Sequence, residues 1–254
     1  MSHDGFSPSW LRLREPYDHA ARSTALADRL AATLPSRPHV VELACGLGSG
    51  HRFLAPRLPD ASWCLVDHDP LLLDHAPAGV ETRLLDLRTA LPDGPWDAVV
   101  TQALLDLVSL DWLVMLADWL SAHRLPFLAA LTVDGRVHWS PENPLDAEVQ
   151  AAFRAHQRLD RGFGPSPGPT AAHRMAELLE ARGYTVAVEQ ADWQVEASAS
   201  HMLTFMVDGT AEAARVTHTR PARVDTWHAQ RSADVAAGRV RLTVGHFDLV
   251  ALPG

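Results

Sequence analysis

The chain has 254 residues, of which 47% are hydrophobic and 21% charged, and its formal net charge at pH 7 is −9. This is the composition of an ordinary globular protein, and the length suits one large domain or two small ones. All 22 basic residues are arginines. Chemistries that need a lysine are therefore excluded, among them Schiff-base formation and the lysine clamp of P-loop proteins. The acidic balance also disfavours nucleic acid as a partner.

The sequence carries no secretion or membrane signal that we can identify. Two cysteines, Cys45 and Cys64, do not make a disulfide framework. Residues 1–10 lack the charged and apolar regions of a signal peptide, and no apolar run reaches the ~18 residues of a membrane helix. We therefore expect a cytoplasmic protein with reduced cysteines and no membrane partner.

Short apolar runs alternate with helical patterns from residue 38 onward. Five of these runs carry their apolar residues consecutively, as strands buried on both faces do. They span residues 39–44, 62–66, 82–85, 98–101 and 127–133. Between the last two, apolar residues spaced by three and four predict an amphipathic helix around Trp112 and Leu120. The alternation predicts a doubly wound α/β fold with a mostly parallel sheet.

The last third of the chain predicts the other side of this sheet. Helical patterns lie at residues 171–181, before Gly183, and near 210–216, and strand patterns at 184–189 and 239–252. Two late strands with a long connection predict a seven-stranded sheet with an antiparallel C-terminal edge strand.

The segment 134–170 interrupts the alternation. It contains five prolines and four glycines around one predicted helix at residues 145–159. Prolines and glycines at this density are typical of loops. We therefore expect an insertion, or lid, over the carboxyl edge of the sheet.

A glycine-rich turn follows the first predicted strand, with the sequence ELACGLGSG over residues 42–50. In an open α/β sheet this turn lies where ligands bind, and glycine lets the backbone approach the ligand closely. A dinucleotide turn needs GxGxxG, but the sixth position is His51 counted from Gly46 and Phe53 counted from Gly48. The missing third glycine counts against a nicotinamide dinucleotide.

An acidic residue, a small residue and a GxG turn together resemble motif I of the class I S-adenosylmethionine-dependent methyltransferases. Glu42, Gly46 and Gly48 match this motif, and Ala44 stands where the family most often has glycine. The second strand pattern is followed by Asp67, and a carboxylate at this place can accept hydrogen bonds from both hydroxyls of a ribose.

The next two strand ends extend the resemblance. Asp86 stands where the family has the acid that accepts a hydrogen bond from the adenine amino group, and Leu87 follows it. Gln102 begins the segment that in the family faces the methionine moiety and the acceptor. Taken singly, Asp67 or Asp86 could simply cap a helix, but their order along the chain favours a cofactor site. The predicted cofactor-binding residues are Glu42, Ala44, Gly46, Gly48, Asp67, His68, Asp86, Leu87 and Gln102.

The resemblance covers residues 38–133 by ordered motifs and 171–252 by topology only. It implies one methyltransferase-like domain over residues 1–254, with S-adenosylmethionine as cofactor. Because the acidic chain disfavours nucleic acid and shows no added recognition domain, we expect a small molecule as methyl acceptor. The expected parts are an N-terminal helical segment (1–37), a cofactor-binding half (38–133), the insertion (134–170) and the C-terminal half of the sheet (171–254). Two alternatives stay open: a nicotinamide-dependent oxidoreductase, and a catalytically silent partner or scaffold subunit with this fold.

Arg14 has two interpretations in the N-terminal segment. Its guanidinium could clamp a carboxylate of the cofactor or the acceptor. Arg14, Asp18 and Arg22 also have the spacing of an ion-pair ladder on a helix surface, although Pro16 is expected to begin that helix and to leave Arg14 outside it.

Further acceptor-site candidates are His138 and Trp139 in the insertion and Asp106 after the fourth strand, although Asp106 fits a solvated helix edge equally well. His156 lies one turn before Asp160 on the predicted helix. This pair could act as an oriented general base, or His156 could be an inward-facing histidine beneath a loop. The sequence has no HxH, HExxH or CxxC motif, so we expect no metal site.

Overall fold

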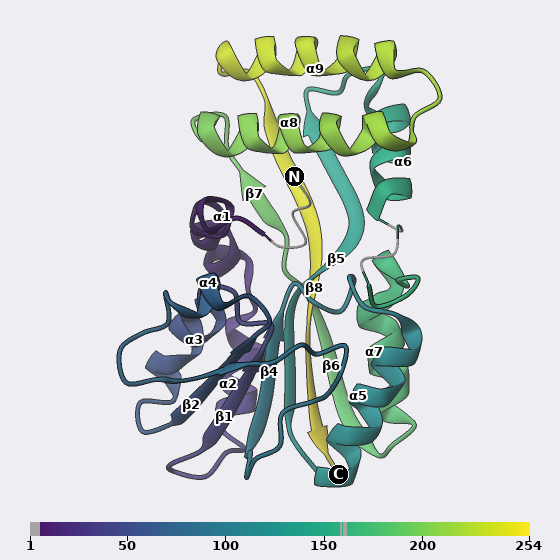
Figure 1. Ribbon diagram of the computed structural model, residues 1–254. Helices are drawn as coiled ribbons and strands as arrows, with labels where there is room; N and C mark the ends of the chain where they lie inside the picture. The colour runs from purple at the N-terminus through teal and green to yellow at the C-terminus, as the bar shows by residue number, and fades with distance from the viewer. Residues whose placement is uncertain (1–5, 158, 160–161) are drawn as a thin grey trace.

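The computed structural model describes residues 6–157, 159 and 162–254. Its eight-stranded sheet has the order β3-β2-β1-β4-β5-β8-β6, with β7 paired to β8 (Figure 1). The strands are β1 (His39–Leu43), β2 (Ser62–Asp67), β3 (Glu81–Leu84), β4 (Ala98–Gln102), β5 (Phe127–Ser140), β6 (Tyr184–Gln190), β7 (Trp193–Val195) and β8 (Arg241–Pro253).

The predicted mostly parallel sheet with an antiparallel C-terminal strand is confirmed. Strands β1 to β5 are mutually parallel, and β8 runs antiparallel to both of its long neighbours, β5 and β6. The antiparallel strand lies one place in from the edge, because β6 pairs along its outer side. The eighth strand, the three-residue β7, was not predicted from the sequence; it pairs with the first part of β8.

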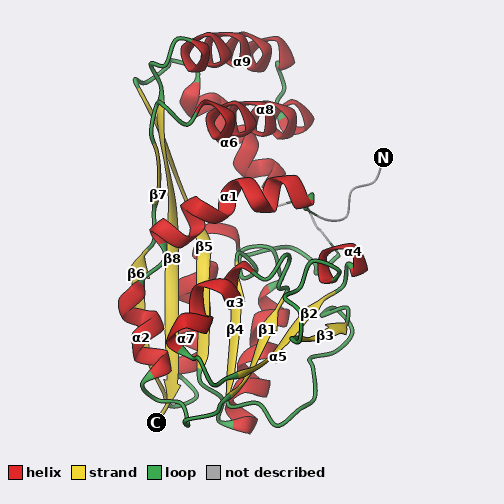
Figure 2. Ribbon diagram, turned by 90° about the vertical axis from the view of Figure 1, so that its left-hand side faces the viewer, coloured by secondary structure: helices red, strands yellow, loops and turns green. Residues whose placement is uncertain are grey.

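Helices cover both faces of this sheet (Figure 2). In β1, Val41 faces a core formed with the helices at residues 110–123 and 171–180, and its neighbour Val40 faces a core formed with the helices at residues 24–31 and 49–54. The apolar residues are consecutive because both faces are buried. The helices are α1 (Pro8–Ala21), α2 (Thr24–Ala31), α3 (Ser49–Leu54), α4 (Pro70–Leu73), α5 (Leu110–His123), α6 (Asp146–Gln157), α7 (Ala171–Glu180), α8 (Ser200–Thr217) and α9 (Pro221–Ala236).

The long strands β5 and β8 extend past the rest of the sheet and carry a second layer of structure. Their outer halves pair from Val137 opposite Val244 to Ser140 opposite Arg241. Helices α6, α8 and α9 lie beside this extension, at the top of Figure 1, and share a core with it. We call α6, α8, α9, β7 and the outer halves of β5 and β8 the helical cap.

The segment 134–170 therefore differs from the expected insertion. Its first seven residues continue β5, and only the part from residue 141 onward leaves the sheet. Register shifts before Thr132 and before Val137 let β5 stay paired with β8 while it changes direction. The predicted helix is present as α6.

Helix α1 begins earlier than the sequence predicted. Pro8 occupies the first helical turn and the Ser7 hydroxyl accepts a hydrogen bond from the Trp10 amide, which is a favourable start. Pro16 lies inside the helix, where a proline costs about 3 kcal/mol. The helix continues through it because its inner face is buried, with Arg14 and Asp18 both among the buried residues. Within the described residues, no helix is long and apolar enough to cross a membrane.

Candidate functional site

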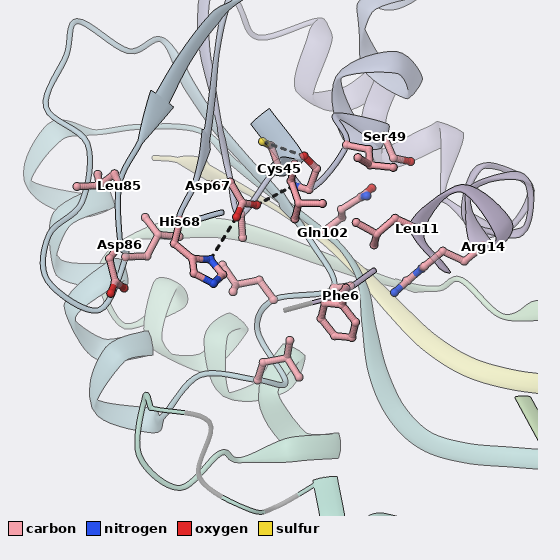
Figure 3. Close-up of a pocket in the computed structure, with 18 of the residues that line it drawn as sticks. Phe6, Leu11, Arg14, Cys45, Ser49, Asp67, His68, Leu85, Asp86 and Gln102 are labelled. Carbon is pink, nitrogen blue, oxygen red and sulfur yellow. Dashed lines mark hydrogen bonds and ion pairs between the residues drawn. The ribbon is translucent and has the colours of Figure 1, made fainter. Parts of the chain in front are cut away.

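A pocket of about 460 Å³ lies at the carboxyl ends of β1, β2 and β4, between these strands and α1 (Figure 3). Its position is the usual ligand position in an open α/β sheet. Of the predicted site residues, eight line it: Arg14, Ala44, Gly46, Asp67, His68, Asp86, Leu87 and Gln102. Residues that the sequence analysis did not select include Phe6, Leu11, Asp18, Cys45, Leu47, Ser49, Leu72, Leu85, Arg88 and Phe163.

The glycine-rich turn forms the floor of the pocket beside Asp67. Ala44, Gly46 and Gly48 all have positive φ angles, of 51°, 56° and 76°. Glycine adopts this left-handed conformation without strain, which is a physical reason for glycine at positions 46 and 48, whereas Ala44 adopts it with a Cβ. A Cβ on Gly46 would lie 3.2 Å from the Leu11 side chain of α1. The turn is therefore packed closely under α1.

Asp67 joins the turn to the end of β2. Its side chain is 5% exposed; Oδ2 accepts a hydrogen bond from the Gly46 amide at 2.8 Å, and Oδ1 accepts one from the Asp69 amide at 3.1 Å. The imidazole of His68 lies beside it, with Nδ1 3.2 Å from Oδ1. A carboxylate has about four acceptor sites, so both oxygens can still accept hydrogen bonds from hydroxyls in the pocket.

Asp86 lies at the other end of the pocket with Arg88 attached to it. Arg88 Nε is 2.9 Å from both carboxylate oxygens, and Nη2 is 2.7 Å from Oδ2. These hydrogen bonds hold the pKa of Asp86 below its usual value, so the carboxylate is ionised at neutral pH. Leu87 lies beside it, and its carbonyl accepts a hydrogen bond from the Trp112 indole at 2.8 Å.

Two predicted cofactor residues act from beneath the pocket and do not line it. Glu42 is fully buried, and its Oε2 accepts a hydrogen bond from the His51 amide at 2.8 Å. A Cβ on Gly50 would lie 2.3 Å from Glu42 Oε1, so this glycine makes room for the acid. Burial raises the pKa of Glu42 to about 7. Gly48 is the N-cap of α3. Both residues shape the turn from below.

The α1 side of the pocket contains a buried ion pair and not the predicted surface ladder. Arg14 Nε lies 3.1 and 3.0 Å from the two oxygens of Asp18, and Asp18 Oδ1 also accepts a hydrogen bond from the Trp193 indole at 3.0 Å. Arg22 follows the end of α1 and donates to Gln102 Oε1 at 3.4 Å. Had Ser7 and Pro8 been taken as the helix start, the spacing of Leu11, Arg14 and Asp18 would have predicted this inner face.

The structure does not bring His138 and Trp139 to the pocket. Both lie on the outer half of β5, opposite Thr243 and Leu242 of β8. His138 is exposed on the surface, whereas Trp139 is 1% exposed and packs edge-on against Trp227 in the cap. The acceptor-site prediction for these two residues assumed that β5 ends at residue 133, and the pairing with β8 carries them away.

The remaining candidates also lie outside the pocket lining. Asp106 is buried next to it, and its carbonyl accepts a hydrogen bond from the Ser166 hydroxyl. His156 lies in the last turn of α6, a helix of the cap. Its predicted partner Asp160 lies outside the described residues. The His156–Asp160 pair therefore stays a prediction.

Similar known proteins include a curated relative and solved structures. No protein-family model matches the chain. Over 160 residues it is 30% identical to the biotin biosynthesis bifunctional protein BioCD of Bordetella avium (strain 197N), a match that covers 53% of this chain and 33% of that protein. The chain thus spans about a third of the length of this curated relative.

Among solved structures, the cyclopropane-fatty-acyl-phospholipid synthase-like protein from Lactobacillus casei ATCC 334 is similar at a TM-score of 0.53 and 17% identity, covering 98% of this chain and 95% of that one. The chain has the class I methyltransferase fold. A cyclopropane synthase from Mycobacterium tuberculosis also matches, at a TM-score of 0.48 and 15% identity over 98% of this chain and 95% of that one. Within the class I methyltransferase fold, the pocket of this chain occupies the carboxyl edge of the sheet.

Proposed function

We propose that this chain is an S-adenosylmethionine-dependent methyltransferase that acts on a small-molecule acceptor in the cytoplasm. The observation that carries the proposal is Asp67, a buried carboxylate that is hydrogen-bonded to the glycine-rich turn at the end of β2 and faces the pocket. The acidic chain favours an acceptor other than nucleic acid.

The residues of the pocket fit this cofactor from end to end. Asp67 would accept hydrogen bonds from the ribose hydroxyls, and Asp86 from the adenine amino group. Leu87 and Leu85 would contact the adenine ring, since both line the pocket beside Asp86. The floor formed by Ala44 and Gly46 would lie under the sulfonium end. Two observations support this arrangement: the pocket presents carboxylate acceptors that suit hydroxyl and amino groups, and a close turn lies beneath.

The bound cofactor would supply an electrophilic methyl group, so the main task of the protein is to orient the acceptor. Positioning of this kind can lower a barrier by several kcal/mol. Helix α1 contributes Leu11 to the pocket lining, close above Gly46. Removal of a proton from the acceptor would need a base, and no pocket residue takes that role in the proposal.

The alternatives make different predictions. A nicotinamide-dependent oxidoreductase is not favoured, because the turn lacks the third glycine that leaves room for a pyrophosphate. A catalytically silent subunit would bind the cofactor and transfer no methyl group to any acceptor. Ligand binding separates the first alternative from the proposal, and release of S-adenosylhomocysteine in an acceptor screen separates the second.

The test is calorimetric titration with S-adenosylmethionine, S-adenosylhomocysteine and NAD in parallel. We expect micromolar binding of the first two and none of NAD. Asp67→Ala should weaken both by about 10-fold to 100-fold, since it removes hydrogen bonds to a charged group. Asp69→Ala is the matched control, because it removes an acid two residues away that caps α4. Binding of NAD alone, or equal affinity in the Asp67 variant and the wild type, would refute the proposal.

A further inference from the structure

We propose that the α1 end of the pocket is a carboxylate-binding subsite and that Arg14 is its binding group. The inference rests on the proposed function, because it assigns a part of the same pocket. Figure 3 shows Arg14, Leu11 and Phe6 together on the side of the pocket opposite Asp86. The subsite therefore lies far from the adenine end.

The guanidinium of Arg14 is fixed in place by its neighbours. Its Nε lies within 3.1 Å of both oxygens of Asp18, and Asp18 is held in turn by the Trp193 indole. The guanidinium carbon lies 4.9 Å from the centre of the Trp193 ring and 5.8 Å from that of Trp10. An arginine held on one edge and stacked in this way loses little freedom when it binds an anion.

The opposite edge of the guanidinium still has donors to offer. Arginine carries five N–H groups, and the four on Nη1 and Nη2 match a carboxylate in a bidentate geometry. No hydrogen bond joins Nη1 or Nη2 to any part of the chain that the structure describes. The Arg14 side chain is only 10% exposed, so water satisfies these donors poorly and a carboxylate would satisfy them well.

Arg14 lines this end of the pocket, whereas Arg22 lies beside it and donates to Gln102. The Asp18 carboxylate forms an ion pair with Arg14, and the Trp193 indole donates a hydrogen bond to the same carboxylate. Burial lowers the pKa of His246, which lies behind Trp193, to about 3, so this histidine stays neutral at neutral pH. Leu11 and Phe6 supply apolar contact on the pocket side. The ligand group that fits is a carboxylate attached to an apolar body.

A carboxylate of this kind has two possible sources. One is the amino-acid end of the cofactor, which would reach over Gly46 toward α1. The other is an acidic group on the acceptor. Both sources need the same contact with Arg14, and ligands that lack the carboxylate distinguish them.

The first arm of the test compares S-adenosylhomocysteine with 5′-methylthioadenosine, which lacks the amino-acid end. Calorimetric titrations would use the wild type, Arg14→Gln and the matched control Arg12→Gln, which removes an arginine of the same helix that contacts His75 at the surface. If the cofactor supplies the carboxylate, Arg14→Gln lowers the affinity for S-adenosylhomocysteine by about tenfold or more and leaves the affinity for 5′-methylthioadenosine unchanged. Arg12→Gln should change neither affinity.

The second arm tests an acceptor carboxylate in protein saturated with S-adenosylhomocysteine. Octanoate and the uncharged octanamide are the probes. If the acceptor supplies the carboxylate, octanoate binds the wild type better than octanamide does, and Arg14→Gln abolishes the difference.

The proposal is overturned if Arg14→Gln changes neither the affinity for S-adenosylhomocysteine nor the preference for octanoate over octanamide. It is also overturned if Arg14→Gln lowers the affinities for S-adenosylhomocysteine and 5′-methylthioadenosine equally. Should Arg14→Gln fail to fold, Arg14→Lys decides with the same ligands, because it keeps the charge and loses the bidentate fork. Failure of wild-type protein to bind S-adenosylhomocysteine would refute the proposed function instead, and the octanoate arm would then test Arg14 in protein without that ligand.

Discussion

The pocket and the helical cap are built on the same sheet but use their polar groups differently. Around the pocket, Asp67 ends β2, Asp86 lies two residues after β3, and both carboxylates face a cavity. In the cap, the buried Arg231 forms an ion pair with Asp146, which also accepts a hydrogen bond from the Trp227 indole. The first arrangement leaves acceptors for a ligand, whereas the second uses its polar groups to join α6 to α9.

This difference indicates where ligand-binding residues are expected in the fold. Short parallel strands end together, so the residues that follow them converge on one edge. The paired halves of β5 and β8 end instead against helices, and the aromatic residues there fill a core. Substitutions in the cap should therefore change stability, and substitutions around the pocket should change binding.

The largest expected effect is in the cap core. Trp227 is fully buried, packs edge-on against Trp139 at 5.8 Å between ring centres, and donates to Asp146 at 2.7 Å. Trp227→Ala should lower the free energy of unfolding by about 3 to 5 kcal/mol. Urea denaturation measures this, with Trp227→Phe as a milder control. Affinity for S-adenosylhomocysteine at low temperature should stay at the wild-type value, and a loss of affinity would break the separation between cap and pocket.

The next effect is a pH dependence located beneath the pocket. Burial raises the pKa of Glu42 from 4.5 to about 7, so the folded state binds a proton more tightly than the unfolded state. The resulting stability is fully present below pH 4.5 and is lost as the pH rises through about 7, by about 3 kcal/mol.

Glu42→Gln mimics the protonated acid and should remove this part of the pH dependence. We expect the variant to be more stable than the wild type at pH 8, and the advantage to shrink at pH 5. Denaturation curves at both pH values measure the difference in free energy of unfolding between the variant and the wild type. Both proteins contain the same histidines, so the contribution of histidine titration cancels in this difference. An advantage that does not change with pH would contradict the raised pKa.

A smaller effect is expected at the adenine end. Asp86→Ala should lower the affinity for 5′-methylthioadenosine by about 3-fold to 10-fold, because one hydrogen bond at a partly exposed site is lost. The matched control is Glu81→Ala. Glu81 is an exposed acid at the start of β3, the strand before Asp86, and it pairs with Arg83. Equal affinities in all three proteins would place the adenine elsewhere.

The smallest effect is expected on the outer surface of the cap. Val216 is 67% exposed on α8, so Val216→Ser should change the free energy of unfolding by less than about 0.5 kcal/mol and leave ligand affinity unchanged. Thermal denaturation and one titration suffice. A large loss of stability would show that this face of α8 is covered in solution.

Much of the pocket could be predicted from local sequence. Consecutive apolar residues predicted β1 to β4, since parallel strands covered on both faces need them, and the polar residue after each strand must then lie at the carboxyl edge. Asp67 was found in this way, whereas Asp86 and Gln102 were found by their resemblance to the methyltransferase motifs. Glu42 was found by its motif, but its place beneath the turn depends on the packing of α3, which the sequence does not display.

Only the tertiary structure decided the rest, because it depends on contacts between distant parts of the chain. Pairing with β8, more than 100 residues away, carries β5 past residue 133 and moves His138 and Trp139 into the cap. Burial of one face of α1 keeps Pro16 inside the helix and brings Arg14 to the pocket. Periodicity and turn residues encode local conformation, whereas such long-range contacts are fixed by which surfaces bury each other.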